Sequence, residues 1–86
     1  MSKRRRIPKL RVVERKLGRE KAFGLCYRGI GLVEIDPRQE SKEYLDTLIH
    51  EMLHNFFPHA AEWRVGKVAT KMASVLWKHN YRRIKD

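Results

Sequence analysis

SKEYLDTLIHEMLHNFFP, residues 41–58, carries the most regular pattern of apolar side chains in the sequence. Apolar residues occur in adjacent pairs at positions 44/45, 48/49, 52/53 and 56/57, and a repeat of four forms a broad stripe on an α-helix. Ser41 is a suitable N-cap residue, and Pro58 cannot continue a helix. The pattern therefore predicts a helix that starts at Lys42 and ends before Pro58.

The segment before this helix has the pattern of a β-hairpin. Residues 21–27 and 30–36 are two apolar runs separated by Arg28-Gly29, and Asp36-Pro37 ends the second run. Residues 11–15 form a further candidate strand.

The segment after Pro58 predicts a second helix that begins near Ala60 and ends around His79-Asn80. Its expected buried face consists of Val65, Val68, Ala69, Met72, Ala73, Leu76 and Trp77. The expected fold is therefore α+β, with a small antiparallel β-hairpin or three-stranded sheet packed on two α-helices.

The chain has 86 residues and a formal net charge of +10. This length suits one compact domain, so we expect a basic flexible arm over residues 1–9 and a single domain over residues 10–86.

Basic residues gather at the two ends: ten basic and two acidic residues lie in 1–22, and seven basic and one acidic in 63–86. Residues 23–62 carry three basic and seven acidic residues. Cationic ends indicate either a solubilising surface or non-specific contact with a polyanion such as a nucleic acid. The basic run at the first end is Lys3, Arg4, Arg5 and Arg6.

Cys26 is the only cysteine, which excludes an intramolecular disulfide framework. The sequence shows no signal-like apolar N-terminus and no run of 18 apolar residues, so we expect a cytoplasmic protein without membrane contact.

His50, Glu51 and His54 form an H-E-x-x-H motif inside the predicted first helix. Residues four apart lie on one face of a helix, so both imidazoles can bind one Zn²⁺. Glu51 is displaced around the helix and can instead act as a general base toward a water on the metal. The motif therefore predicts a zinc-dependent hydrolase, and the competing interpretation is two surface histidines beside a solvated carboxylate.

A hydrolytic zinc site needs a third protein ligand and one open position. Glu62 falls on the first turn of the second helix, and that turn points back toward the histidine pair if the helices are antiparallel. His59 lies in the corner itself and is the alternative. Asp46 lies one turn before His50 and is a candidate carboxylate for holding an imidazole N–H.

The motif and its flanking residues resemble the small metallopeptidases of bacteria and their phages, which are minimal HExxH proteins of the zincin group. The resemblance rests on residues 48–54, Phe57-Pro58, Glu62-Trp63, Val65, Ala69, 75–77 and 81–83. It implies a zincin-like domain with a hydrolase-like zinc site, for which we expect a peptide or protein substrate. It also implies an acidic third ligand at the position of Glu62. A weaker similarity to SprT-like zincins would place the third ligand at His59, but the spacing is one residue short.

Two other functions stay open at this point. One is a nucleic-acid-binding module in which zinc is structural, and the other is an inactive interaction protein with a zincin fold. An intact Glu51 favours the peptidase, because a general base has no use in the other two.

Overall fold

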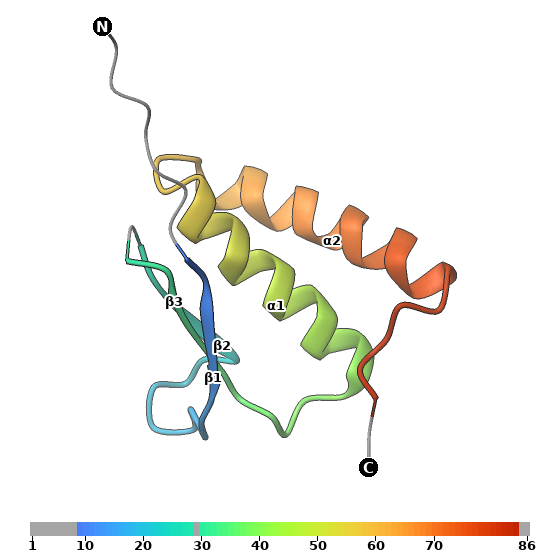
Figure 1. Cartoon of the computed structure of the whole chain (residues 1–86), viewed down its shortest axis with the longest axis horizontal. Helices are drawn as coiled ribbons and strands as arrows, with labels where there is room; N and C mark the ends of the chain where they lie inside the picture. Colours follow the sequence, from blue (N-terminus) through green and yellow to red (C-terminus); the bar gives the residue numbers. More distant parts are fainter. Residues whose placement is uncertain (1–8, 29, 85–86) are drawn as a thin grey trace, which may run out of the picture.

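The structure is a computed structural model that describes residues 9–28 and 30–84. Three strands precede two helices: β1 (Arg11–Glu14), β2 (Gly24–Tyr27), β3 (Leu32–Ile35), α1 (Ser41–Phe56) and α2 (Glu62–Lys78) (Figure 1). The α+β fold expected from the sequence is confirmed, with a three-stranded sheet rather than a hairpin alone.

The sheet is mixed, with strand order β1-β3-β2. The predicted hairpin is confirmed, because β2 and β3 pair antiparallel, although each strand is shorter than the apolar run that predicted it. Strand β1 pairs parallel with β3, which the expectation of an antiparallel sheet did not include. Central β3 is therefore paired on both sides, and β1 and β2 are the edges of the sheet.

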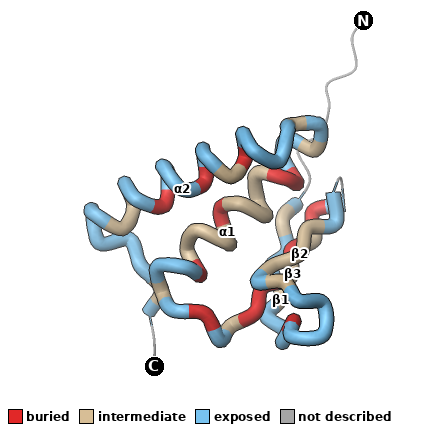
Figure 2. The backbone as a smooth tube through the Cα atoms, turned by 180° about the vertical axis from the view of Figure 1, so that it is seen from behind, coloured by how far each residue is buried: buried red, intermediate tan, exposed pale blue. Residues whose placement is uncertain are grey.

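Helix α1 is the middle layer of the molecule. It contacts β2 and β3 on one side and α2 on the other, whereas α2 contacts no strand. The core accordingly has two parts, one between α1 and the sheet around Val33, Ile35 and Tyr44, and one between the helices around Ile49, Ala69 and Ala73. Figure 2 shows buried segments along one side of α2 alternating with exposed ones.

Helix α1 begins one residue earlier than the sequence predicted, and α2 begins two residues later. Ser41 is the first residue of α1 and not its cap; Glu40 holds the cap position and makes no side-chain capping bond. The first helix ends at Phe56, where the Phe57 N–H donates to the Leu53 carbonyl, and α2 starts at Glu62. Residues 57–61 form the tight corner that reverses the chain.

Asn55 fixes the hairpin to the C-terminal end of α1. Its side chain is 2% exposed, accepts a bond from the Gly31 N–H at 2.9 Å, and donates to the Leu32 carbonyl at 3.1 Å and to Cys26 Sγ at 3.0 Å. A buried amide with its bonding capacity used in this way holds its partners in one geometry. The turn after β2 is therefore held beside the residues of the HExxH motif.

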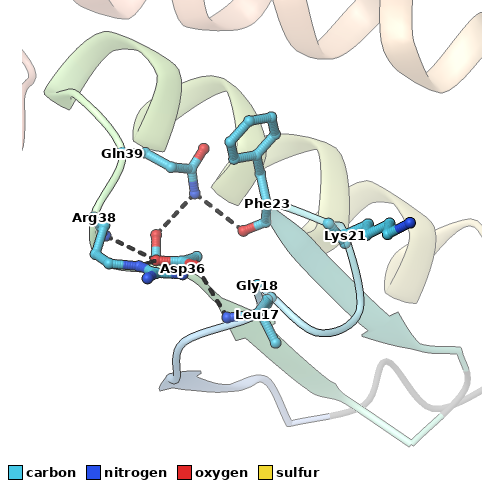
Figure 3. A pocket seen from close by; sticks show the side chains of 8 residues that line it. Leu17, Gly18, Lys21, Phe23, Asp36, Arg38 and Gln39 are labelled. Atoms are coloured by element: carbon cyan, nitrogen blue, oxygen red, sulfur yellow. Dashed lines mark hydrogen bonds and ion pairs between the residues drawn. The ribbon is translucent and has the colours of Figure 1, made fainter.

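Asp36 is the centre of a hydrogen-bond network between the end of β3 and the start of α1 (Figure 3). Its carboxylate accepts bonds from the Leu17 N–H at 2.9 Å, the Arg38 N–H at 3.0 Å and the Arg38 guanidinium at 2.6 and 2.9 Å. Gln39 donates from Nε2 to the backbone oxygens of Phe23 and Asp36 at 3.0 and 2.9 Å. These residues line a hollow of about 540 Å³, and we call them the Asp36 cluster (Leu17, Phe23, Asp36, Arg38 and Gln39).

The predicted basic arm, with Lys3, Arg4, Arg5 and Arg6, lies outside the described residues apart from Lys9, which is exposed. Within residues 9–28 and 30–84, neither helix combines the length and apolar character needed to span a bilayer.

Candidate metal centre

Three side chains from two helices converge at the α1–α2 corner. His54 Nε2 lies 2.7 Å from Glu62 Oε1, and His50 Nε2 lies 2.8 Å from Glu62 Oε2. The two Nε2 atoms are 3.2 Å apart. Each of the three residues thus offers one ligand atom to a common point, and we call this group the metal centre (His50, His54 and Glu62).

The local sequence explains this convergence. The two histidines are four residues apart, so they project from one face of α1 with ring centroids 4.8 Å apart. The corner at 57–61 reverses the chain and brings the first turn of α2 next to the last turns of α1. Glu62 is in that first turn, where a carboxylate also interacts favourably with the positive end of the helix dipole.

Burial and charge differ across the metal centre. The His54 side chain is only 4% exposed, whereas that of Glu62 is 69% exposed. Burial lowers the pKa of His54 below its ordinary value, against the opposing effect of the Glu62 carboxylate. The pKa of Glu62 is lowered as well: partial burial would raise it, but the neighbouring His50 and His54 have the larger effect. A neutral imidazole and an ionised carboxylate have the net charges in which these groups bind metals.

The donor set fits Zn²⁺. Two imidazoles and one carboxylate are an established set for a catalytic zinc ion, which keeps its fourth position open. Ligands at 2.0–2.2 Å in a tetrahedron are separated by roughly 3.3–3.5 Å. The two Nε2 atoms, 3.2 Å apart, are close to this range. Glu62 meets His54 and His50 through different oxygens at 2.7 and 2.8 Å, so coordination through one oxygen needs a rotation of the carboxylate and an expansion of about 0.6 Å. The exposed Glu62 can supply that expansion without disturbing the buried His54.

Glu51 lies outside the group of ligand atoms and faces β2. A Cβ atom on Gly24 would lie 3.0 Å from Glu51 Cγ and 3.2 Å from Glu51 Oε2, so the bare backbone of β2 packs against this side chain. Burial raises the pKa of Glu51, and the Glu62 carboxylate adds to that effect against the opposing influence of His50 and Arg28. A carboxylate with a raised pKa, next to a metal-type donor set, has the properties of a general base.

Arg28 was not predicted from the sequence. It follows β2 directly, and its guanidinium lies 3.2 Å from His54 Nδ1 and donates to the Pro58 carbonyl at 2.9 Å. Arginine has no acceptor atoms, so Nδ1 accepts this bond and the ring proton is on Nε2. A neutral ring that binds a cation through Nε2 carries its proton on Nδ1 instead. The Arg28 contact and a metal ion therefore compete for His54.

The remaining candidates lie elsewhere. His59 is exposed in the corner, and the group of possible ligands in the described residues does not include it. Asp46 accepts a bond from the Thr70 hydroxyl of α2 at 3.1 Å, and no bond between Asp46 and His50 is present in the described part of the chain. That the Asp46 carboxylate accepts a hydrogen bond from an imidazole N–H stays a prediction.

Comparisons with family models, with curated proteins and with solved structures find no match to this chain. The metal centre is therefore interpreted from its own geometry.

Proposed function

We propose that this protein is a zinc-dependent hydrolase that acts on peptides, in the manner of small HExxH metallopeptidases. One observation carries the proposal: the three candidate ligands converge, while Glu51 of the same motif stays outside their group and faces the edge strand β2. A structural zinc site has no need of an adjacent base.

The residues divide into two roles. His50, His54 and Glu62 would hold the metal. When bound at such a site, Zn²⁺ lowers the pKa of its water ligand to about 7 and polarises a carbonyl group. Glu51 would accept the proton of the attacking water and deliver it to the leaving amine, which is the usual task of a carboxylate with a raised pKa.

The substrate would lie along β2 and not along the central strand β3. Strand β3 is paired on both sides, so its backbone groups are taken, whereas β2 is an edge of the sheet. An extended peptide can add to such an edge through main-chain hydrogen bonds. Gly24 would place that peptide beside Glu51.

We also propose a reducing, cytoplasmic location. Cys26 is the only cysteine in the chain, and its thiol is held by Asn55 inside the fold instead of pairing. Burial, with a contribution from Glu51, raises the pKa of Cys26 to about 11, so the thiol is protonated and chemically inert near neutral pH.

The proposal is tested with the zinc-loaded protein and a library of internally quenched peptides. Wild type is expected to cleave a subset of the library. Glu51→Gln keeps the shape and removes the base, so it should bind zinc normally and lose about 10²–10⁴-fold in rate. Equal turnover by the two proteins, or loss of zinc from Glu51→Gln, contradicts the assigned role. Absence of cleavage by a fully zinc-loaded wild type overturns the hydrolase and favours a structural zinc site.

A further inference from the structure

The outer side of α2 carries a row of basic residues that the metal centre does not use. Arg64, Lys67, Lys71 and Lys78 are all exposed. At 100° per residue they fall within an arc of about 60°, centred almost opposite the buried Ala69. With a rise of 1.5 Å per residue, the row spans about 21 Å from Arg64 to Lys78. We call it the α2 cationic face (Arg64, Lys67, Lys71 and Lys78).

No acidic partner balances this row within the described residues. None of the ion pairs found there involves any of the four residues. Glu62 is the only acidic residue of α2, and its carboxylate is engaged by His50 and His54. Lys67 Nζ lies 5.9 Å from the centre of the exposed Trp63 ring, which carries no opposite charge. The positive charge of the row is therefore available to a partner.

The basic tail that follows α2 is engaged differently. The Arg82 guanidinium lies 3.8 Å over the Trp77 ring and donates to the Trp77 carbonyl. Arg83 pairs with Glu14 at 2.9 Å and donates to the Pro37 carbonyl. These two arginines hold the tail against the fold, so the available charge of residues 63–84 is concentrated on the helix.

We propose that the α2 cationic face binds the phosphate backbone of duplex DNA. Lysine and arginine side chains that neutralise phosphates supply most of the affinity of sequence-independent binding. A straight helix with charges spread over about 21 Å presents them to several phosphates of a stiff duplex at once.

The composition of the face argues against other anionic partners. A helix that lies on a membrane buries an apolar face between its basic residues. On α2, Val65, Ala69 and Ala73 are already packed on α1, and the exposed Val68, Met72 and Val75 lie about 50–110° to one side of the centre of the row instead of between its members. Proteins that bind single strands stack successive bases on several aromatic side chains. Trp63 is the one exposed aromatic side chain on α2, and it lies about 70° to one side of the row.

The experiment measures binding of the full chain to a fluorescein-labelled 20-base-pair duplex by anisotropy, from 25 to 200 mM salt. Each phosphate contact contributes about −0.9 to the slope of log affinity against log salt, so four contacts on this face give about −3.6. Lys67→Gln/Lys71→Gln should lower the magnitude of the slope by about 1.8 and weaken binding at 50 mM salt at least about tenfold. Two duplexes of unrelated sequence should behave alike, because phosphate contacts carry no sequence information.

The matched control is Lys16→Gln/Arg19→Gln, which removes the same charge from the exposed loop before β2. It should change affinity less than threefold. Lys67→Arg/Lys71→Arg keeps the charge and should bind like wild type, which separates a lost contact from a misfolded helix. Glu51→Gln should also bind DNA normally, because this inference is independent of the metal centre.

Three results would overturn the proposal. The first is equal weakening by the α2 variant and the loop control, which would make binding a matter of net charge. The second is wild-type affinity in the α2 variant, which would assign binding to another part of the chain. The third is absence of binding to the duplex at 25 mM salt. Binding to vesicles of phosphatidylserine and phosphatidylcholine is measured in parallel, and dependence on the α2 lysines for vesicles but not for DNA would likewise overturn the proposal.

Discussion

Two polar clusters lie at opposite ends of α1, the metal centre near its C-terminal end and the Asp36 cluster before its N-terminal end. Both assemble residues that are far apart in the sequence, and both contain a carboxylate with a lowered pKa. In the Asp36 cluster, four hydrogen bonds and the Arg38 guanidinium satisfy and neutralise the carboxylate from within the chain.

The metal centre is different because its ligand atoms face one another. Two imidazole nitrogens and the carboxylate of Glu62 approach a common point, and the nearest guanidinium, that of Arg28, contacts the far nitrogen of His54. Both clusters satisfy their polar atoms within the chain, but the metal centre brings two imidazole nitrogens and a carboxylate together, and that donor set can bind a cation when the imidazole protons are on Nδ1. The hollow of about 540 Å³ at the Asp36 cluster is therefore not the candidate site.

The largest effect should come from removing a ligand at the metal centre. Metal bound only by the folded state adds about 2.7 kcal/mol when free Zn²⁺ is 100 times its Kd. Glu62→Ala should lose nearly all of this stabilisation, and His59→Ala should keep it. Thermal unfolding with Zn²⁺ and with a chelator measures the difference. The reverse pattern would move the third ligand to His59.

The next largest effect should come from Gly24, where β2 touches α1. A Cβ atom there would lie 2.6 Å from Thr47 Cγ2, so Gly24→Ala should cost about 1–3 kcal/mol through overpacking. At the Asp36 cluster, a Cβ on Gly18 would meet Arg38 Nη2 at an ordinary 3.5 Å, and Gly18→Ala should stay within about 0.5 kcal/mol. Urea unfolding compares the two. Equal effects would mean that β2 does not press on α1 at this point.

A smaller effect is expected from the arginines of the two clusters. Arg28→Met removes the competitor for His54, so the Zn²⁺ affinity should rise about fivefold, equivalent to about 1 kcal/mol for one hydrogen bond. Arg38→Met should leave the Zn²⁺ affinity unchanged and lower the stability, because it deprives Asp36 of its counter-charge. Isothermal titration and thermal unfolding give both values. Weaker zinc binding by Arg28→Met would show that Arg28 supports the site.

The smallest effect is expected on the stability of the protein at low pH. Hydrogen bonds from Arg38, followed by those from the backbone at Leu17 and Arg38, hold the pKa of Asp36 well below its usual range. A lowered pKa adds stability that is present above the unfolded value of about 3.9 and is lost as the pH falls below it. Arg38 is 55% exposed, so water screens the pair and the effect is modest. The stability of wild type should thus fall more steeply than that of Asp36→Asn below pH 4; parallel curves would contradict this.

The sequence predicted the features that depend on local spacing. The period of four defined α1, the HExxH spacing placed two imidazoles on one face, and the direction of a reversed helix brought Glu62 toward them. The parallel pairing of β1 with β3 and the contact of Arg28 with His54 were not predictable, because they join residues more than twenty positions apart.

The buried face of α2 was predicted too broadly. Val68 and Met72 are 40% and 43% exposed, since α2 packs on α1 alone and no further layer covers its flank. The apolar period locates a helix face, and only the neighbouring elements decide how much of that face is buried.

X-ray absorption at the zinc edge of the metal-loaded protein, together with its metal content, tests the central claim most directly. We expect one zinc ion per chain with two imidazole ligands at 2.0–2.1 Å and one carboxylate oxygen at 2.0–2.2 Å. His50→Ala and His54→Ala should each abolish this signature. Absence of bound zinc, sulfur scattering from Cys26, or an unchanged spectrum in either variant would contradict the metal centre described above.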